Sequence, residues 1–389
     1  MQSNDSTIRA KQAAAVMSPA DFRKIAHELG REFAGRAEGY DRDDRFVAEN
    51  YERLKAERIF SALCPQELGG GGVSHSDLCE FLRILGSYCP STALALSMHQ
   101  HLISATLWKY RHGQGGEAVL KKVAAGQLVL VSTGARDWLE SNGTLEPVEG
   151  GFLLNARKAF ASQSVVGDVM VTSARYDDPE QGAQVFHFSV PFAAEGVTVL
   201  DDWYTMGMRG TGSCTIQLQN VFVPEDAIVL RRPQGAYHQV WNLVLTVAMP
   251  LIMAVYVGAA EQAAELAIAQ ARKNEDPAPH VPYLLGELHN SLTTARVVWR
   301  NMVALANDLE VKPTDQLGQD ILTHKTIVAD ACRQTVDRAI DLVGGQSFLR
   351  KSKLERFYRD LQASRFHPLP APEQKVFSGN YLLAGLGAK

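Results

Sequence analysis

The sequence is short of cysteine and of net charge, and its first residues lack an apolar run. Five cysteines occur among 389 residues without any C-x-x-C spacing, so neither a disulfide framework nor a structural zinc site is predicted. The 39 lysines and arginines against 43 aspartates and glutamates leave a net charge of −4, which disfavours a nucleic-acid surface. Residues 1–12 are polar and lack an apolar signal core. We expect a reduced, cytoplasmic protein without a metal site.

One long hydrophobic run is present. Residues 241–260 are almost all apolar and are about long enough to cross a bilayer. The run also holds Asn242, Thr246 and Pro250, and no basic cluster anchors it on one side. Helices that are apolar on every side also occur inside large proteins. We therefore predict a buried core helix and no membrane partner.

The period of the apolar residues changes twice along the chain. We predict a helical domain over residues 1–125, a strand-rich domain over 126–232 and a helical bundle over 233–389. Strands without intervening helices predict an antiparallel barrel or sandwich, here over 128–133, 152–155, 169–174, 185–190 and 216–223. The predicted helices begin at the Ser18-Pro19 cap and include 50–63, 91–108, 239–271 and 354–365.

A glycine-rich stretch is the most informative part of the chain. Gly207, Gly210 and Gly212 lie within six positions and allow tight turns and close backbone approach. An alternating strand follows and ends at Pro224. The residues alone predict a tight loop that leads into a strand, and they identify no ligand.

The same stretch resembles a known family. MGMRGTGS at 206–213 and VFVPEDAI at 221–228 are similar to the middle-domain signature of the acyl-CoA dehydrogenase superfamily, and ALCPQELGGGGVSHSDL at 62–78 is similar to its turn between N-terminal helices. The resemblance extends from about Ala62 to Gly379. It implies an α+β fold with an N-terminal helical domain, a middle antiparallel β-barrel and a C-terminal four-helix bundle, with FAD, rather than FMN, bound between barrel and bundle.

The resemblance also implies flavin contacts on the barrel. The strand that contains Leu130, Ser132 and Thr133 corresponds to the first flavin-contacting strand. Phe160 would face the flavin ring and Ser162 would hydrogen-bond near its N5 atom. From the residues alone, an ordinary core aromatic is the alternative for Phe160. The segment Gly134–Trp138 departs from the family pattern, which leaves the substrate contacts of that loop open.

Further contacts are implied across a subunit interface. Arg272 stands where the family places an arginine that reaches the flavin of a neighbouring subunit, although the usual aromatic-glycine pair does not follow it. Asp341, Gly344 and Gly345 match a Gln-x-x-Gly-Gly turn, with aspartate in place of glutamine. A homotetramer is implied. An exposed helix arginine is the alternative reading of Arg272.

The catalytic glutamate of a dehydrogenase of this family has no counterpart in its usual places. In the family the glutamate follows an Arg-Asp pair by a fixed interval, and after Arg359-Asp360 that interval ends at Pro368; the alternative source, the long apolar helix, offers no acid, since residues 227–260 contain neither aspartate nor glutamate. Glu373 is a possible substitute. His367 stands at the turn, and an imidazole there resembles the flavin monooxygenases of the same fold, which form a C4a-peroxide from reduced flavin and O₂. Catalytic candidates are His367 and Ser162, with His99 or His101 as a second imidazole.

Three functions remain open from the sequence. The first is a monooxygenase that acts on an acyl thioester or a small aromatic substrate, with O₂ as co-substrate and a possible separate flavin reductase. The second is an acyl-CoA or acyl-carrier dehydrogenase with an unrecognised base. The third is a scaffold stabilised by flavin. For each histidine, a satisfied structural residue is the alternative, and His99-x-His101 lacks a third ligand for a metal.

Overall fold

The computed structural model describes residues 18–133 and 139–384, and its N-terminal part is helical. The predicted start of the first helix is confirmed, since the Ser18 hydroxyl accepts a hydrogen bond from the Asp21 N–H. The predicted helix 50–63 is wrong in length, because Arg58 takes a left-handed conformation (φ 58°) and ends it early. The helices are α1 Pro19–Arg42, α2 Ala48–Ala56, α3 His75–Tyr88, α4 Pro90–Arg111 and α5 Glu117–Gly126.

The middle of the chain forms one eight-stranded sheet in the order β6-β7-β3-β2-β4-β5-β8, with β1 paired to β4. The expectation of an antiparallel barrel needs correction, because β4 runs parallel to both β1 and β2. Periodicity identifies a strand but carries no information about its direction. The strands are β1 Leu130–Ser132, β2 Thr144–Val148, β3 Gly151–Lys158, β4 Val169–Asp178, β5 Gly182–Pro191, β6 Val197–Val199, β7 Ile216–Pro224 and β8 Leu230–Pro233.

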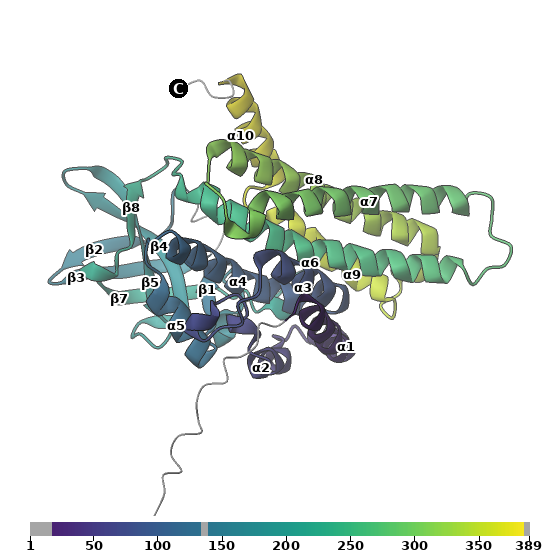
Figure 1. Cartoon of the computed structure of the whole chain (residues 1–389), viewed down its shortest axis with the longest axis horizontal. Coiled ribbons are helices and arrows are strands. Elements are labelled where there is room, and N and C mark those ends of the chain that lie inside the picture. Colours follow the sequence, from purple (N-terminus) through teal and green to yellow (C-terminus); the bar gives the residue numbers. More distant parts are fainter. Residues whose placement is uncertain (1–17, 134–138, 385–389) are drawn as a thin grey trace, which may run out of the picture.

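The C-terminal part is a bundle built around α6. The prediction of a buried core helix is confirmed: α6 is long and apolar enough to cross a membrane, yet 94% of its most apolar window is buried inside the protein. In Figure 1 the sheet lies at one end and α6, α7 and α8 extend away from it, while α3 and α4 pack against α6. The helices are α6 Val240–Ala271, α7 Val281–Ala306, α8 Asp315–Val343, α9 Lys353–Gln362 and α10 Ala371–Leu383.

Helices α3 and α6 cross at two glycines. A Cβ atom on Gly258 would lie 1.9 Å from the Arg83 carbonyl oxygen, and one on Gly86 would lie 2.6 Å from the Val255 carbonyl oxygen. Backbone therefore packs against backbone, and no flexible side chain can move away to make room. This crossing fixes the core helix against the N-terminal helices.

Gly258→Ala is expected to lower the free energy of unfolding by about 2 kcal/mol, because an overpacked core must shift its backbone. Gly286→Ala on α7 is the matched control, since its Cβ would meet nothing within 4 Å. That control is expected to raise stability by about 0.5–1 kcal/mol through helix propensity. Denaturant titration of both variants measures the difference, and equal stability of the two would contradict the close crossing.

Candidate functional site

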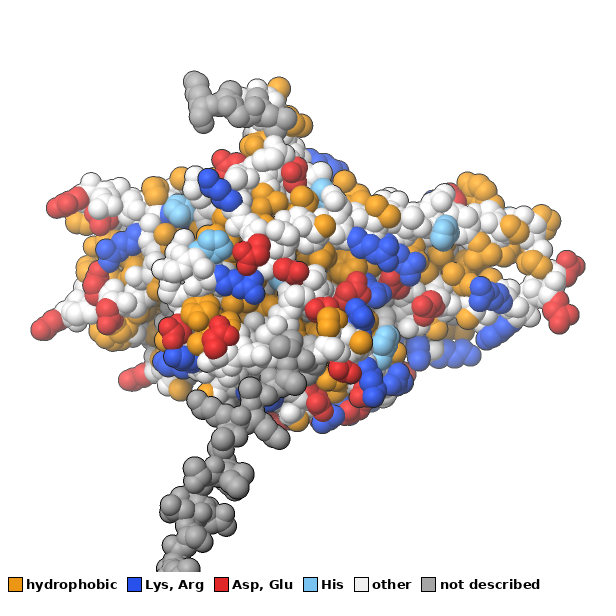
Figure 2. Space-filling view, in the orientation of Figure 1, with side chains coloured by type: hydrophobic (Ala, Val, Ile, Leu, Met, Phe, Trp, Pro, Cys, Tyr) orange, Lys and Arg blue, Asp and Glu red, His pale blue; other side chains and the backbone are white. Residues whose placement is uncertain are grey.

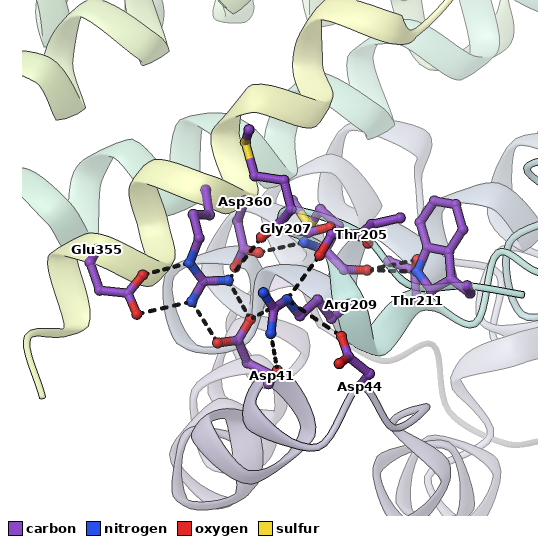
Figure 3. Close-up of polar contacts among 12 residues, drawn as sticks. Asp41, Asp44, Thr205, Gly207, Arg209, Thr211, Glu355 and Asp360 are labelled. Carbon is purple, nitrogen blue, oxygen red and sulfur yellow. Dashed lines mark hydrogen bonds and ion pairs between the residues drawn. The ribbon is translucent and has the colours of Figure 1, made fainter. Parts of the chain in front are cut away.

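The glycine loop at 201–215 is fastened to the bundle by α9. The Asp360 carboxylate accepts a hydrogen bond of 2.6 Å from the Met208 N–H. A Cβ on Gly207 would lie 2.3 Å from the Arg359 carbonyl oxygen, so only glycine permits this approach. Arg359 also donates to both carboxylate oxygens of Asp41 at the end of α1, at 2.8 and 2.6 Å (Figure 3). One short motif on α9 therefore joins the loop, the bundle and α1.

Arg209 holds the same loop from the other side. Its Nε donates to the Thr205 carbonyl oxygen at 2.9 Å, and its Nη1 donates to the Asp41 carbonyl oxygen at 3.1 Å (Figure 3). An ion pair of 3.4 Å joins it to Asp44. These contacts are internal to the fold, so we interpret Arg209 as a structural residue of the loop.

His99 of α4 is hydrogen-bonded to the backbone of Leu130, the first residue of β1. The Nε2 of His99 lies 2.8 Å from the Phe60 carbonyl oxygen and its Nδ1 accepts from the Leu130 N–H at 3.0 Å. The Leu130 carbonyl accepts from the Gln163 side chain at 2.8 Å. Burial lowers the pKa of His99 to about 4, so the ring is neutral near pH 7. Both ring nitrogens of His99 and both backbone polar groups of Leu130 are thus engaged within the protein.

Gln163 is a residue that the sequence reasoning missed. It is fully buried, and its Oε1 accepts from the Tyr51 hydroxyl at 2.5 Å while its own N–H donates to the Thr211 carbonyl. It therefore ties β1, α2 and the glycine loop together. Its position one residue after Ser162 is the only sequence signal, because its partners are far apart along the chain.

Ser162 begins a chain of three hydroxyls, which we call the hydroxyl chain: Ser162, Ser213 and Thr211. The oxygens of Ser162 and Ser213 are 2.8 Å apart, and those of Ser213 and Thr211 are 2.7 Å apart. Thr211 donates in turn to the Met208 carbonyl oxygen at 2.9 Å. The chain connects the predicted flavin-contacting residue Ser162 to the glycine loop.

Phe160 lies on the surface, two residues before the start of the hydroxyl chain at Ser162. Its side chain is 62% exposed, which excludes the core aromatic considered from the sequence, and its ring meets Trp203 edge-on at 5.9 Å. Its backbone has φ 57°, an uncommon conformation for a bulky residue. Strain of this kind concentrates at functional sites.

Ser132 and Thr133 lie at the end of β1, where the Thr133 and Thr172 hydroxyls are 3.2 Å apart. Gly134–Trp138 lies outside the described residues.

His367 is held by two buried residues of the bundle. The Tyr256 hydroxyl of α6 lies 2.6 Å from its Nε2, and the Lys325 ammonium of α8 donates to the carbonyl oxygens of His367 and Leu369 at 2.9 and 2.8 Å. The side chain keeps a partly open surface. Even so, desolvation by its packed surroundings, with a smaller effect of Lys325, lowers the pKa of His367 to about 3. The imidazole is therefore neutral near pH 7 and does not titrate there.

His101 differs from its neighbour His99. It is 7% exposed, and within the described part of the chain its Nδ1 makes no hydrogen bond of normal geometry, although the Ser97 backbone lies close enough to oppose the fall in its pKa. Burial lowers its pKa to about 4. A buried nitrogen without a partner is costly, and such atoms in native proteins point to a ligand, a water or a functional role.

The other predicted residues lie at the far end of the bundle. Arg272 is exposed and caps the C-terminus of α6, about 24 Å along the helix from Tyr256 at 1.5 Å per residue. Asp341 is exposed and pairs with Arg338 at 3.4 Å. Gly344, at φ 69°, and Gly345 have open space where a Cβ would stand. The fold thus separates these four residues from Ser162 and His367 within one chain.

Comparison with known proteins identifies the family. The chain matches the models for the acyl-CoA dehydrogenase N-terminal domain over residues 20–127, the middle domain over 134–221 and the C-terminal domain over 251–370. The chain belongs to the acyl-CoA dehydrogenase superfamily. The resemblance inferred from the glycine loop is confirmed, as is the three-part architecture of acyl-CoA dehydrogenases.

Relatives within the acyl-CoA dehydrogenase superfamily differ in chemistry. Putative acyl-CoA dehydrogenase YdbM of Bacillus subtilis (strain 168) is 28% identical over 89% of this chain and 93% of its own length. Amino sugar nitrososynthase DnmZ of Streptomyces peucetius is 28% identical over 84% of each chain. The structure of KijD3 in complex with FMN and a dTDP-linked amino keto sugar has a TM-score of 0.84 and 27% identity, covering 98% of this chain and 95% of that one.

The residues near Ser162 fit the flavin of an acyl-CoA dehydrogenase fold. An exposed aromatic ring at Phe160 offers an apolar face, and the hydroxyls of Ser162 and Thr133 offer hydrogen bonds to a ring edge. Most of the surface of the Phe160 ring is left uncovered by the protein, although its backbone is held in a strained conformation. A bound flavin supplies redox chemistry that no side chain has, and the chain supplies orientation and electrostatics.

Proposed function

We propose that the chain is a flavin-dependent monooxygenase of the acyl-CoA dehydrogenase fold, acting on a small molecule with O₂ as co-substrate. The observation that carries the proposal is the turn at 367–369, where a neutral imidazole and Pro368 stand in place of a carboxylate. Abstraction of a proton α to a thioester needs a base within hydrogen-bond reach of the carbon. The relatedness to a nitrososynthase supports the same reading.

Two carboxylates of the bundle, Asp360 and Glu261, are held by other partners. Asp360 is buried against the Met208 N–H, and Glu261 of α6 pairs with Arg83 and with Arg296 at 2.6 Å. Glu373, the substitute considered from the sequence, is exposed in the first turn of α10. Asp360 and Glu261 are therefore not free to act as a base at the turn, and we propose that Glu373, on the surface of α10, does not act there either.

We assign roles to the chain's own side chains as follows. Phe160 packs on the face of the flavin ring, and Ser162 hydrogen-bonds its N5 edge. His367 offers a neutral imidazole, fixed by Tyr256 and Lys325, to substrate or to the oxygen atoms being transferred. His101 presents a second neutral imidazole from α4, while His99 positions β1. In the proposed site these neutral side chains exclude water around the bound flavin, which limits loss of reducing equivalents to the solvent.

The flavin that we propose is FMN, although the family resemblance favours FAD. The two flavins differ in the adenosine diphosphate part that FAD alone carries. The departures at Arg272, which lacks its aromatic-glycine pair, and at Asp341, which replaces glutamine, fall in the signature for that part. The FMN complex of KijD3 supports this choice. A separate reductase would then supply the flavin in its reduced form.

We also propose a homotetramer in the cytoplasm. Exposed apolar side chains gather on the bundle, and Figure 2 shows hydrophobic surface over its outer end. They include Tyr283 (68% exposed) on α7 and Phe348 (91% exposed) after α8. Exposed apolar groups gathered in this way mark interaction sites.

The test uses the purified chain with FMN or FAD, reduced under nitrogen and then exposed to isotopically labelled O₂. Amino sugar nucleotides, small aromatics and acyl thioesters serve as candidate substrates. We expect a product that carries one labelled oxygen atom with at least one class. Loss of all reducing equivalents as hydrogen peroxide with every class would contradict the proposal, and binding of neither flavin would contradict any flavin enzyme.

A further inference from the structure

The direction of the hydroxyl chain is determined by its end. The Met208 carbonyl oxygen can only accept, so Thr211 must donate its single hydroxyl proton to it. The Thr211 oxygen can then only accept from Ser213, at 2.7 Å. Ser213 has used its proton, so it accepts from Ser162, at 2.8 Å. Only this order makes all three contacts hydrogen bonds.

The consequence for Ser162 concerns its hydrogen-bond polarity. The Ser162 hydroxyl donates its one proton to Ser213, so toward a ligand its oxygen can act only as a hydrogen-bond acceptor. Ser213 and Thr211 are 5% and 1% exposed, so water does not readily replace either partner. Thr211 is held further by its N–H bond to the same Met208 carbonyl, and Met208 by Asp360.

We propose that Ser213 and Thr211 are positioning residues that make Ser162 a hydrogen-bond acceptor and thereby favour reduced over oxidised flavin. The inference rests on the proposed function, in which Ser162 meets the flavin N5. In reduced flavin N5 carries a hydrogen and donates, whereas in oxidised flavin N5 has a lone pair and accepts. An acceptor at Ser162 therefore bonds the reduced form and offers nothing to the oxidised form.

Such a preference suits an enzyme that receives its flavin already reduced. The protein would retain the reduced cofactor until O₂ and substrate arrive, and would release the oxidised form for exchange. Without these partners, the Ser162 hydroxyl could rotate to accept a hydrogen bond from reduced flavin or to donate one to oxidised flavin. The buried partners remove that freedom.

The test compares the dissociation constants of reduced and oxidised FMN, measured by fluorescence titration under nitrogen. In Ser213→Ala the Ser162 proton is released and can be donated to oxidised N5. Because a neutral hydrogen bond contributes about 1 kcal/mol, the ratio of the oxidised to the reduced constant is expected to fall about fivefold. The midpoint potential of bound flavin should fall with it, by about 20 mV for a two-electron couple.

Three further variants separate this polarity from simple packing. Thr211→Val keeps the shape but frees the Ser213 proton to point back to Ser162, so the ratio should fall as in Ser213→Ala. Ser213→Thr keeps the hydroxyl and should keep the wild-type ratio. In a Ser162→Ala background, Ser213→Ala should have no further effect on the ratio.

The outcomes distinguish failure of this inference from failure of the proposed function. If wild type binds flavin and Ser213→Ala leaves the ratio unchanged or raises it, this inference is overturned while the proposed function stands. An equal fall in the Ser162→Ala background would assign the effect to packing and overturn the inference too. Failure of wild type to bind either redox form would overturn the proposed function, and the inference with it.

Discussion

His367→Ala is expected to lower the yield of oxygenated product by about a hundredfold, the effect of removing one positioned hydrogen-bond donor from an active site. The flavin should still bind, because its contacts lie on the sheet side. Reducing equivalents should then appear as hydrogen peroxide. Since the pKa of His367 is lowered to about 3, product yield in wild type should show no titration of this residue between pH 6 and 8. Product and peroxide per reduced flavin consumed are the measurements.

Two variants accompany this one. His289→Ala removes an exposed histidine of α7 and should leave the yield unchanged. Tyr256→Phe keeps the ring but removes the contact to the His367 Nε2 and should lower the yield about tenfold. A His367→Ala enzyme that couples flavin oxidation to product as well as wild type does would show that the imidazole has no part in the chemistry.

Asp360 is expected to make stability depend on pH in the acid range. Burial, opposed by the nearby Arg356 and the Met208 N–H, raises the pKa of this carboxyl from 3.8 to about 6. The folded protein therefore holds the proton more tightly than the unfolded chain, so stability falls as pH rises from about 4 to 6. Two pKa units correspond to about 3 kcal/mol. The side chain of Asp360→Asn cannot titrate, so the stability of this variant should lack this part of the dependence on pH.

The measurement is the difference in unfolding free energy between wild type and Asp360→Asn at pH 4 and pH 7. That difference should move by about 3 kcal/mol in favour of the asparagine variant at the higher pH. Asp276→Asn, in the exposed connection before α7, is the matched control and should move little. A difference that is the same at both pH values would contradict a raised pKa at Asp360.

Much of the fold follows from local patterns. The Ser18-Pro19 cap, the apolar helix α6 and the alternating strand β7 are all encoded in neighbouring residues. The misses have physical causes. Strand β2 contains Pro147 and is largely exposed, so it shows no buried run. Helix α10 was not predicted, and it carries Pro372 in its first turn, where proline is tolerated.

The site was less predictable than the fold. Phe160 and Ser162 came from the family resemblance and not from any local pattern. The support residues Gln163, Tyr256 and Lys325 were missed, since their roles depend on partners far along the chain. Lys325 did leave a signal: it stands in the apolar stripe between Ile321 and Val328, and a lysine in such a position is rarely buried without a purpose. The direction of the hydroxyl chain has no sequence signal, because it depends on the Met208 carbonyl.

The central claim is that the turn at 367–369 of this acyl-CoA dehydrogenase fold offers no carboxylate for proton abstraction and that the enzyme uses reduced flavin with O₂. An anaerobic titration of the chain, loaded with oxidised flavin, against a series of acyl-CoA thioesters tests it most directly. The account predicts that the flavin absorbance stays that of the oxidised form at every thioester concentration. Bleaching of the flavin by a thioester in the absence of oxygen would contradict it and establish a dehydrogenase.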